Sequence, residues 1–182
     1  MSTFPIIYRT YPSRNSEPWS IWLRAWLPVL AFSTIFAIES TTYFGSNHTS
    51  APLQRVAEAV CGYDMGVYWK AIHRMIRKTG HFMAYGTFSL ICFRALWIVL
   101  LKASSQLRRK LQAHGGAILI TFLVASADEF HQTFLPNRDG TFSDVLLDTC
   151  GAVALGLVLF LAVLAVERQR QASLNGQPVY VE

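Results

Sequence analysis

Four long apolar runs constrain this chain more than any other feature of its sequence. They lie at about residues 21–39, 80–101, 115–135 and 144–166, and each is long enough to cross a bilayer as a helix. Lipid offers the backbone no hydrogen-bond partner, so a spanning segment closes its own hydrogen bonds. Hydrophobic residues make up 52% of the chain and charged residues only 15%, whereas a soluble domain carries roughly 25% charge. We therefore predict an all-α, polytopic membrane protein with four transmembrane helices.

The predicted membrane domain covers residues 21–166. Residues 1–20 contain Ser, Pro and Arg without apolar periodicity, so we predict a flexible N-terminal segment. Residues 167–182 form a polar C-terminal tail. A charged segment before an apolar run also fits a signal peptide, but the length of the first run and the lack of a small-residue cleavage site favour an uncleaved helix.

The interval between the first two runs contains two amphipathic segments. Residues 49–62 repeat apolar side chains at helical spacing and end at a glycine, and residues 68–78 place apolar and basic side chains on opposite faces. We expect two short helices in this first loop, each lying in the membrane interface.

Basic residues gather in the gaps between the apolar runs. This distribution, with a net charge of +5, is expected beside anionic lipid headgroups and does not indicate a nucleic-acid partner. Four spans place both termini on one side, and the short loop 102–114 is the densest basic segment. Short basic loops favour the cytoplasm, so we expect both termini to be cytoplasmic.

Polar groups are concentrated at residues 128–138, where the third run ends, and continue into the start of the fourth. Ionisable groups at membrane depth cost about 2.5–3.5 kcal/mol each, so they pair and face a protein interior or a wet cavity. Antiparallel neighbours bring the start of the second span to the same face. We expect one cluster to form from Lys78, His81, Tyr85, Glu129, Gln132, Arg138, Asp144 and Asp148. These groups can bind a ligand, or can bind only one another and fix the packing.

Some polar residues are expected outside this cluster. On a helix, Asp128 points about 100° away from Glu129, and His131 points about 100° away from Gln132. Histidine with carboxylates is a ligand set for Zn²⁺ or Mn²⁺, but no H-x₃-H or H-E-x-x-H spacing occurs. We therefore predict no metal and no cofactor. The three cysteines show no paired spacing either.

Three stretches resemble the signatures of the VanZ-like family of small bacterial integral membrane proteins. Residues 77–85, RKTGHFMAY, resemble K-x-x-H-F-x-x-Y. Residues 129–138, EFHQTFLPNR, with a downstream aspartate, resemble E-x-x-Q-x-x-x-P-x-R, and residues 148–152, DTCGA, resemble N-T-x-G-A. Asn137 stands where the family usually has Gly, and Asp148 where Asn is common, which adds a negative charge to the site.

The resemblance implies a protein of the bacterial cell envelope, integral to the cytoplasmic membrane. The family takes its name from a protein linked to resistance to teicoplanin, a glycopeptide antibiotic. The resemblance does not fix a biochemical activity.

Two functions fit the cluster. In the first, the protein binds an anionic membrane lipid or a lipid-linked envelope precursor. Lys78 and Arg138 then hold the headgroup, because a guanidinium and an ammonium both suit phosphate. The remaining binding residues are Gln132, Asp144, Asp148 and Tyr85.

The alternative is a membrane-embedded hydrolase or transferase that acts on a phosphate-containing envelope lipid. His81 and Glu129 then exchange protons as acid and base. No Ser or Cys nucleophile beside a base is evident in the sequence, and Ser126 is expected to bond its own helix backbone. The sequence therefore favours the binding function slightly.

Overall fold

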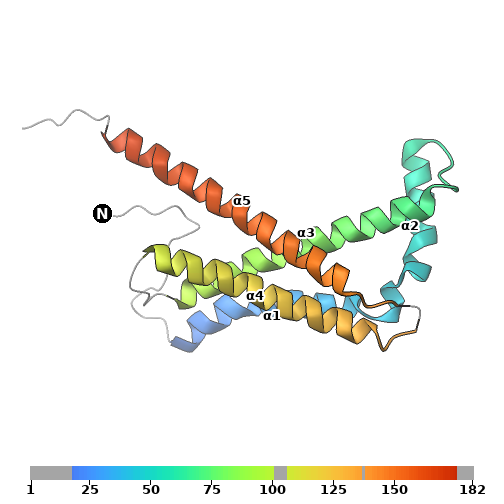
Figure 1. The fold of residues 1–182 in the computed structure, drawn as a ribbon, viewed down its shortest axis with the longest axis horizontal. Helices are drawn as coiled ribbons and strands as arrows, with labels where there is room; N and C mark the ends of the chain where they lie inside the picture. The colour runs from blue at the N-terminus through green and yellow to red at the C-terminus, as the bar shows by residue number, and fades with distance from the viewer. Residues whose placement is uncertain (1–17, 101–105, 137, 176–182) are drawn as a thin grey trace, which may run out of the picture.

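The computed structural model describes residues 18–100, 106–136 and 138–175. In this part of the chain the elements are α1 (Pro18–Glu39), the short 3₁₀ helix η2 (Thr42–Phe44), α2 (Ser46–Cys61), α3 (Trp69–Val99), α4 (Gln106–Gln132) and α5 (Phe142–Asn175). α1, α3, α4 and α5 are long and apolar enough to cross a membrane, and the described residues form no strand (Figure 1). The predicted all-α fold with four membrane spans is confirmed.

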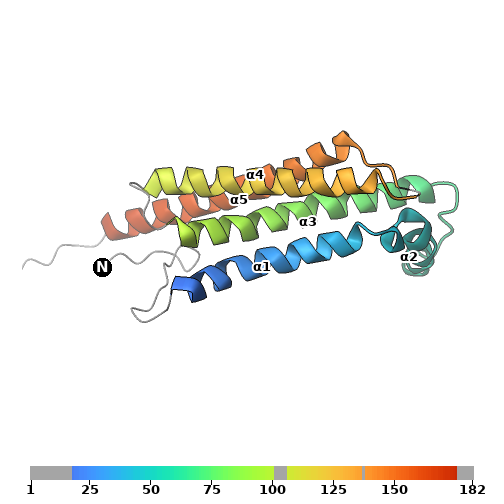
Figure 2. The same cartoon turned by 90° about the horizontal axis from the view of Figure 1, so that it is seen from below.

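α3 is the central helix of the bundle. It packs against α1, α4 and α5, and Figure 2 shows α3 running between α1 and the other two. Large apolar side chains on the outer faces stay exposed, including Leu27 and Leu30 of α1 and Leu157 and Leu161 of α5. Lipid tails cover such faces, which makes this an integral membrane protein.

The first loop differs from the prediction. α2 is the only separate α-helix between the first two spans in the described residues, and residues 69–79 belong to α3. A helix satisfies its own backbone hydrogen bonds. α3 therefore continues without a break from its apolar part into its basic first turns outside the membrane. α2 ends at Cys61 and is capped by Gly62, whose φ of 75° is left-handed and suits a glycine C-cap.

The other helix ends also shift from their predicted positions. α4 ends at Gln132 rather than at residue 135, and hydrogen-bonded turns follow it through Leu135. α5 continues to Asn175, so the described part of the predicted polar tail is helical. The residues of the predicted N-terminal segment before Pro18, and those after Asn175, lie outside the described residues.

Aromatic packing joins α1 to α3 just below the polar end of the bundle. The ring of Phe36 stacks on that of Tyr85 with centroids 4.3 Å apart, and meets Phe88 edge to face at 5.4 Å. Phe88 and Tyr85 are almost completely buried. This aromatic layer supports the polar groups at the end of the bundle.

Candidate functional site: a polar cavity at the end of the bundle

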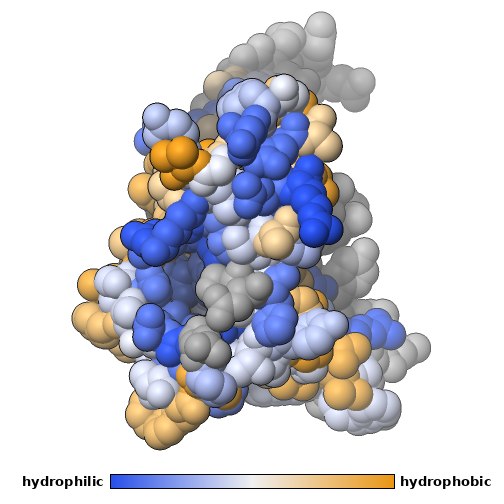
Figure 3. Space-filling model, turned by 90° about the vertical axis from the view of Figure 1, so that its right-hand side faces the viewer, coloured by the Kyte–Doolittle hydropathy of each residue, from blue (hydrophilic) through white to orange (hydrophobic). Residues whose placement is uncertain are grey.

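A cavity of about 290 Å³ opens where α1 ends and α3 begins. Polar side chains gather around a recess on this end of the molecule (Figure 3). The cavity is lined by Phe36, Glu39, Ser40, Phe44, Thr49, Leu53, His73, Arg77, Gly80, His81, Ala84, Tyr85, Asp128, Gln132 and Arg138. α1, η2, α2, α3, α4 and the α4–α5 connection all contribute to the wall.

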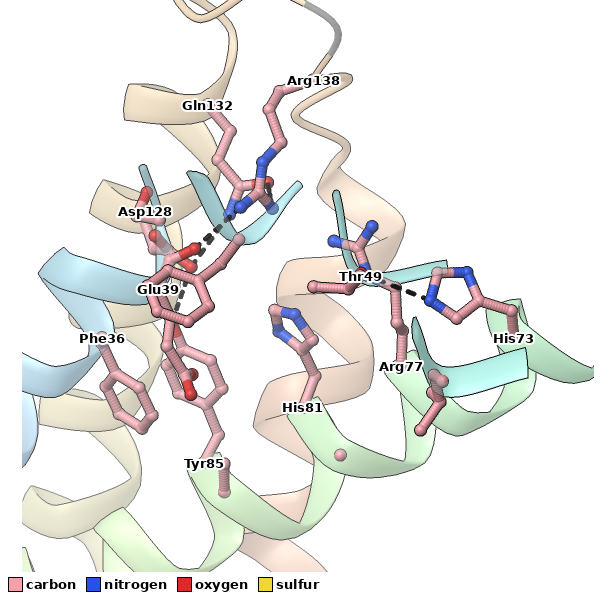
Figure 4. A pocket seen from close by; sticks show the side chains of 15 residues that line it. Phe36, Glu39, Thr49, His73, Arg77, His81, Tyr85, Asp128, Gln132 and Arg138 are labelled. Atoms are coloured by element: carbon pink, nitrogen blue, oxygen red, sulfur yellow. Dashed lines mark hydrogen bonds between the residues drawn. The ribbon is translucent and has the colours of Figure 1, made fainter. Parts of the chain in front are cut away.

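One face of α3 supplies a polar stripe. His73, Arg77, His81 and Tyr85 follow one another at intervals of four residues, which places them on the same side of the helix. His73 makes a 3.4 Å hydrogen bond with the Thr49 hydroxyl of α2. Arg77 has no hydrogen-bond or ion-pair partner among the described residues, although it lines the cavity. Figure 4 shows Arg77 and His81 extending from α3 into the space below Gln132 and Arg138.

Asp128 is the acceptor at the centre of the α4 wall. Its Oδ2 accepts a 2.9 Å hydrogen bond from the Tyr85 hydroxyl and a 3.1 Å hydrogen bond from Gln132 Nε2 (Figure 4). One carboxylate oxygen therefore joins α3 to α4. A charged acceptor with two donors is a strong arrangement in a poorly solvated place.

Arg138 joins the α4–α5 connection to the end of α1. Its Nη2 donates to the carbonyl oxygens of Glu39, at 2.7 Å, and Thr41, at 2.8 Å, and its Nη1 donates to Gln132 Oε1 at 3.5 Å. A cation at the C-terminal end of a helix satisfies carbonyls that the helix leaves free. Burial, together with nearby Arg77, lowers the pKa of the Arg138 guanidinium. Its Nε is buried without a hydrogen-bond partner.

Two acid–base pairs connect α3 to α5 behind the cavity. Lys78 Nζ lies 2.8 Å from Asp144 Oδ1, and His81 Nδ1 lies 3.7 Å from Asp148 Oδ2. Asp148 is completely buried, and neither of its carboxylate oxygens has a hydrogen-bond partner.

Glu129 faces the α4–α5 connection. Its Oε2 accepts a 2.8 Å hydrogen bond from the backbone N–H of Thr141. Thr141 in turn caps α5, because its Oγ1 accepts from the Asp144 N–H at 3.3 Å. Glu129 is buried but is not among the residues that line the cavity.

The structure thus divides the eight residues singled out from the sequence. His81, Tyr85, Gln132 and Arg138 line the cavity, and Asp148 lies directly behind His81. Lys78, Asp144 and Glu129 bind protein partners outside the cavity wall.

Sequence reasoning missed four charged or basic residues of the wall: Glu39, His73, Arg77 and Asp128. The four-residue spacing could have found His73, Arg77 and Asp128, but it does not mark Glu39. Asp128 lies four before Gln132, and Arg77 lies four before His81. The expectation that Asp128 points out of the cluster was wrong.

A second cavity of about 350 Å³ lies beside the first, between α1 and α4. It is lined by Ser33, Phe36, Ala37, Ser40, Val124, Ala127, Asp128 and His131. His131 is outside the polar cavity, as the sequence indicated, and its Nδ1 forms a 2.9 Å hydrogen bond with the Ser40 hydroxyl.

Within the described part of the chain, no group of three or more His, Cys, Asp or Glu side chains is arranged to hold a metal ion.

The family comparison covers this whole arrangement. The model of the VanZ/LLP1 family matches residues 19–164. No curated protein and no solved structure matches the chain. The matched residues include every residue of both cavities, together with the four spans as far as residue 164. This chain belongs to the VanZ/LLP1 family.

Proposed function

We propose that this protein binds the phosphate-bearing headgroup of a membrane lipid or of a lipid-linked envelope precursor in the polar cavity. The observation that carries the proposal is Arg77, a guanidinium in the cavity wall with no hydrogen-bond or ion-pair partner among the described residues. A guanidinium presents its N–H donors in a fork that matches phosphate oxygens. A phosphate in the cavity supplies the acceptors that Arg77 lacks.

The other groups of the wall complement a headgroup rather than oppose it. The Oδ2 of Asp128 is already occupied by the donors of Tyr85 and Gln132. Glu39 also lines the cavity, and its carboxylate accepts hydrogen bonds from hydroxyl or ammonium groups. A common lipid headgroup has two such parts, a phosphate and an alcohol with polar substituents. In this proposal the phosphate lies near Arg77 and the polar substituents lie near Glu39.

The position of the cavity favours a lipid over a free anion. Three spanning helices, α1, α3 and α4, form its walls at the polar end of the bundle. At this level of a membrane protein the neighbouring molecules are lipid headgroups, and basic pockets between spanning helices suit them.

We further propose an orientation in the bacterial cytoplasmic membrane with both termini in the cytoplasm. The basic loop 102–114 supports it. The cavity is then on the outer side, where envelope precursors are used. The link of the VanZ-like family to teicoplanin resistance also supports a ligand that belongs to the cell envelope.

The test compares two arginines of α3. Purified full-length protein in detergent is mixed with phosphatidylglycerol, or with diacylglycerol, which lacks phosphate, and bound lipid is measured by native mass spectrometry. Arg77→Gln should weaken phosphatidylglycerol binding at least tenfold, because a hydrogen bond to a charged group contributes about 1.5–3 kcal/mol and about 1.4 kcal/mol is tenfold in affinity.

Arg74→Gln is the matched control, since it removes the same charge from an exposed site on the same helix outside the cavity. It should leave phosphatidylglycerol binding unchanged. Equal losses in the two variants, or diacylglycerol binding as tight as that of phosphatidylglycerol, would contradict the proposal.

A further inference from the structure

Ser40 directly follows the last residue of α1, and its hydroxyl is bonded unlike most hydroxyls within the spanning helices. In this molecule most Ser and Thr hydroxyls on spanning helices donate to the carbonyl four residues back, as is usual for helices. These are Ser33, Thr34, Thr87, Thr121, Ser126 and Thr149. Ser40 instead makes its 2.9 Å hydrogen bond with Nδ1 of His131, a residue of α4. A hydroxyl within hydrogen-bond reach of an imidazole is the arrangement of a nucleophile with its base.

We propose that Ser40 is a nucleophile and His131 its general base in a phosphoryl-transfer reaction on the bound lipid. The substrate class rests on the headgroup binding proposed above. The geometry of the pair itself stands apart from that proposal, because it comes from Ser40 and His131 alone.

Ser40 lies where the two cavities meet. Phe36, Ser40 and Asp128 line both of them. The basic side chains of the polar cavity are His73, Arg77 and His81 of α3 and Arg138 of the α4–α5 connection. The second cavity is lined largely by apolar groups such as Ala37, Val124 and Ala127. A lipid with its phosphate in the first cavity and its chain in the second has its phosphate–chain linkage at the shared wall. Ser40 is part of that wall.

A cation stands next to the hydroxyl. Arg138 Nη2 donates to the carbonyls of residues 39 and 41, which flank Ser40 on either side. The Arg138 guanidinium therefore lies beside Ser40 and in the same cavity wall. A fixed cation there stabilises the negative charge that phosphate oxygens gain during attack.

The reaction balances without a cofactor. The Ser40 hydroxyl gives its proton to His131 Nδ1 while Oγ forms a bond to phosphorus. The bond from phosphorus to the oxygen of the chain-bearing alcohol breaks, and that alcohol leaves with the proton from His131. Water then attacks the serine phosphoester and gives a proton to His131, the Oγ–phosphorus bond breaks, and the proton returns to Ser40.

Labelling with a fluorophosphonate tests the pair directly, because this probe forms an Oγ–phosphorus bond and releases fluoride without needing a headgroup. Full-length protein in detergent is labelled, and the modified residue is located by peptide mass spectrometry. Ser40 should be the labelled residue, and Ser40→Ala should abolish the modification. His131→Asn keeps a polar partner but removes the base, so labelling should slow at least a hundredfold, as expected for general-base catalysis of roughly 10²–10⁴.

Ser33→Ala is the matched control. Ser33 lines the same second cavity, but its hydroxyl donates to its own helix at Val29, so labelling should proceed at the unaltered rate. Absence of label at Ser40 in the unaltered protein, or an unchanged rate in His131→Asn, overturns the assignment. Phosphatidylglycerol binding that depends on Arg77 then still supports the headgroup site, so the two proposals fail separately.

Discussion

Asp128 and Glu129 are adjacent carboxylates with different surroundings. Asp128 accepts from Tyr85 and Gln132 in the cavity wall, while Glu129 accepts from the backbone of Thr141. One step along a helix rotates a side chain by about 100°, which is enough to separate a site residue from a structural one. Glu129 thus stabilises the connection that leads into α5 by accepting a backbone hydrogen bond from it.

This role of Glu129 predicts a difference between two substitutions. Glu129→Leu leaves the Thr141 N–H without its partner and should cost about 1–3 kcal/mol of stability. Glu129→Gln keeps an oxygen acceptor and should cost less. Thermal unfolding in detergent, followed by circular dichroism, measures both. Equal destabilisation by Leu and Gln would show that the hydrogen bond to Thr141 is unimportant.

Helical periodicity could not choose between these two acids. Gln132 lies three residues after Glu129 and four after Asp128, and both spacings put side chains on one face. The deciding fact is the tertiary position of Tyr85, whose hydroxyl meets Asp128. Such a contact between α3 and α4 depends on helix rotation, which the sequence does not state.

At the scale of elements, α3 and α5 approach closely where small residues face each other. A Cβ on Gly151 would overlap the backbone carbonyl oxygen of Phe82, and a Cβ on Gly86 would lie 2.9 Å from the carbonyl oxygen of Gly151. Small residues that let helix backbones meet are typical of membrane helix contacts. This crossing sets the distance between His81 and Asp148.

Gly151→Ala should therefore be strongly destabilising, because the added methyl group meets backbone that cannot move aside without shifting a helix. Overpacking of this kind costs about 1–3 kcal/mol, and thermal unfolding in detergent measures it. Gly156→Ala is the comparison on the same helix. Its Cβ would lie 3.6 Å from His114 Nδ1, an ordinary contact, so its unfolding temperature should stay close to that of the unaltered protein.

Hydropathy predicted the spanning helices well and their ends poorly. Apolar runs mark the part of a helix that lies in hydrocarbon, whereas α3 extends through Lys70, Arg74 and Arg77 to begin at Trp69. Charges stop a hydropathy run but do not stop a helix. The missed continuity matters for the site, since the first turns of α3 carry His73 and Arg77 into the cavity wall.

At the scale of the whole molecule, the start of α1 and the end of α5 point to the same end of the bundle (Figure 1), and the cavity lies at the other end. The sequence could predict this polarity from the number of spans alone. It could not predict which polar groups turn inward, because hydropathy does not distinguish a lipid-facing side of a helix from a buried one.

The proposed orientation has a direct consequence for Cys61. This residue is exposed at the C-terminal end of α2, in the first loop, while Cys92 is buried and Cys150 lies within the span of α5. With cytoplasmic termini, a membrane-impermeant maleimide should label Cys61 in intact bacterial cells, and Cys61→Ser should remove the signal. Labelling that requires permeabilised cells would indicate the opposite orientation.

The bonds from Arg138 to the carbonyls of Glu39 and Thr41 join positions 99 and 97 residues apart in the chain. During synthesis, the first helix enters the membrane long before the α4–α5 connection leaves the ribosome. The wall of the cavity therefore closes only when the last pair of helices has been inserted. A partly inserted chain has α1 and α3 in place but an incomplete cavity wall, so the proposed headgroup site forms only at the end of membrane insertion.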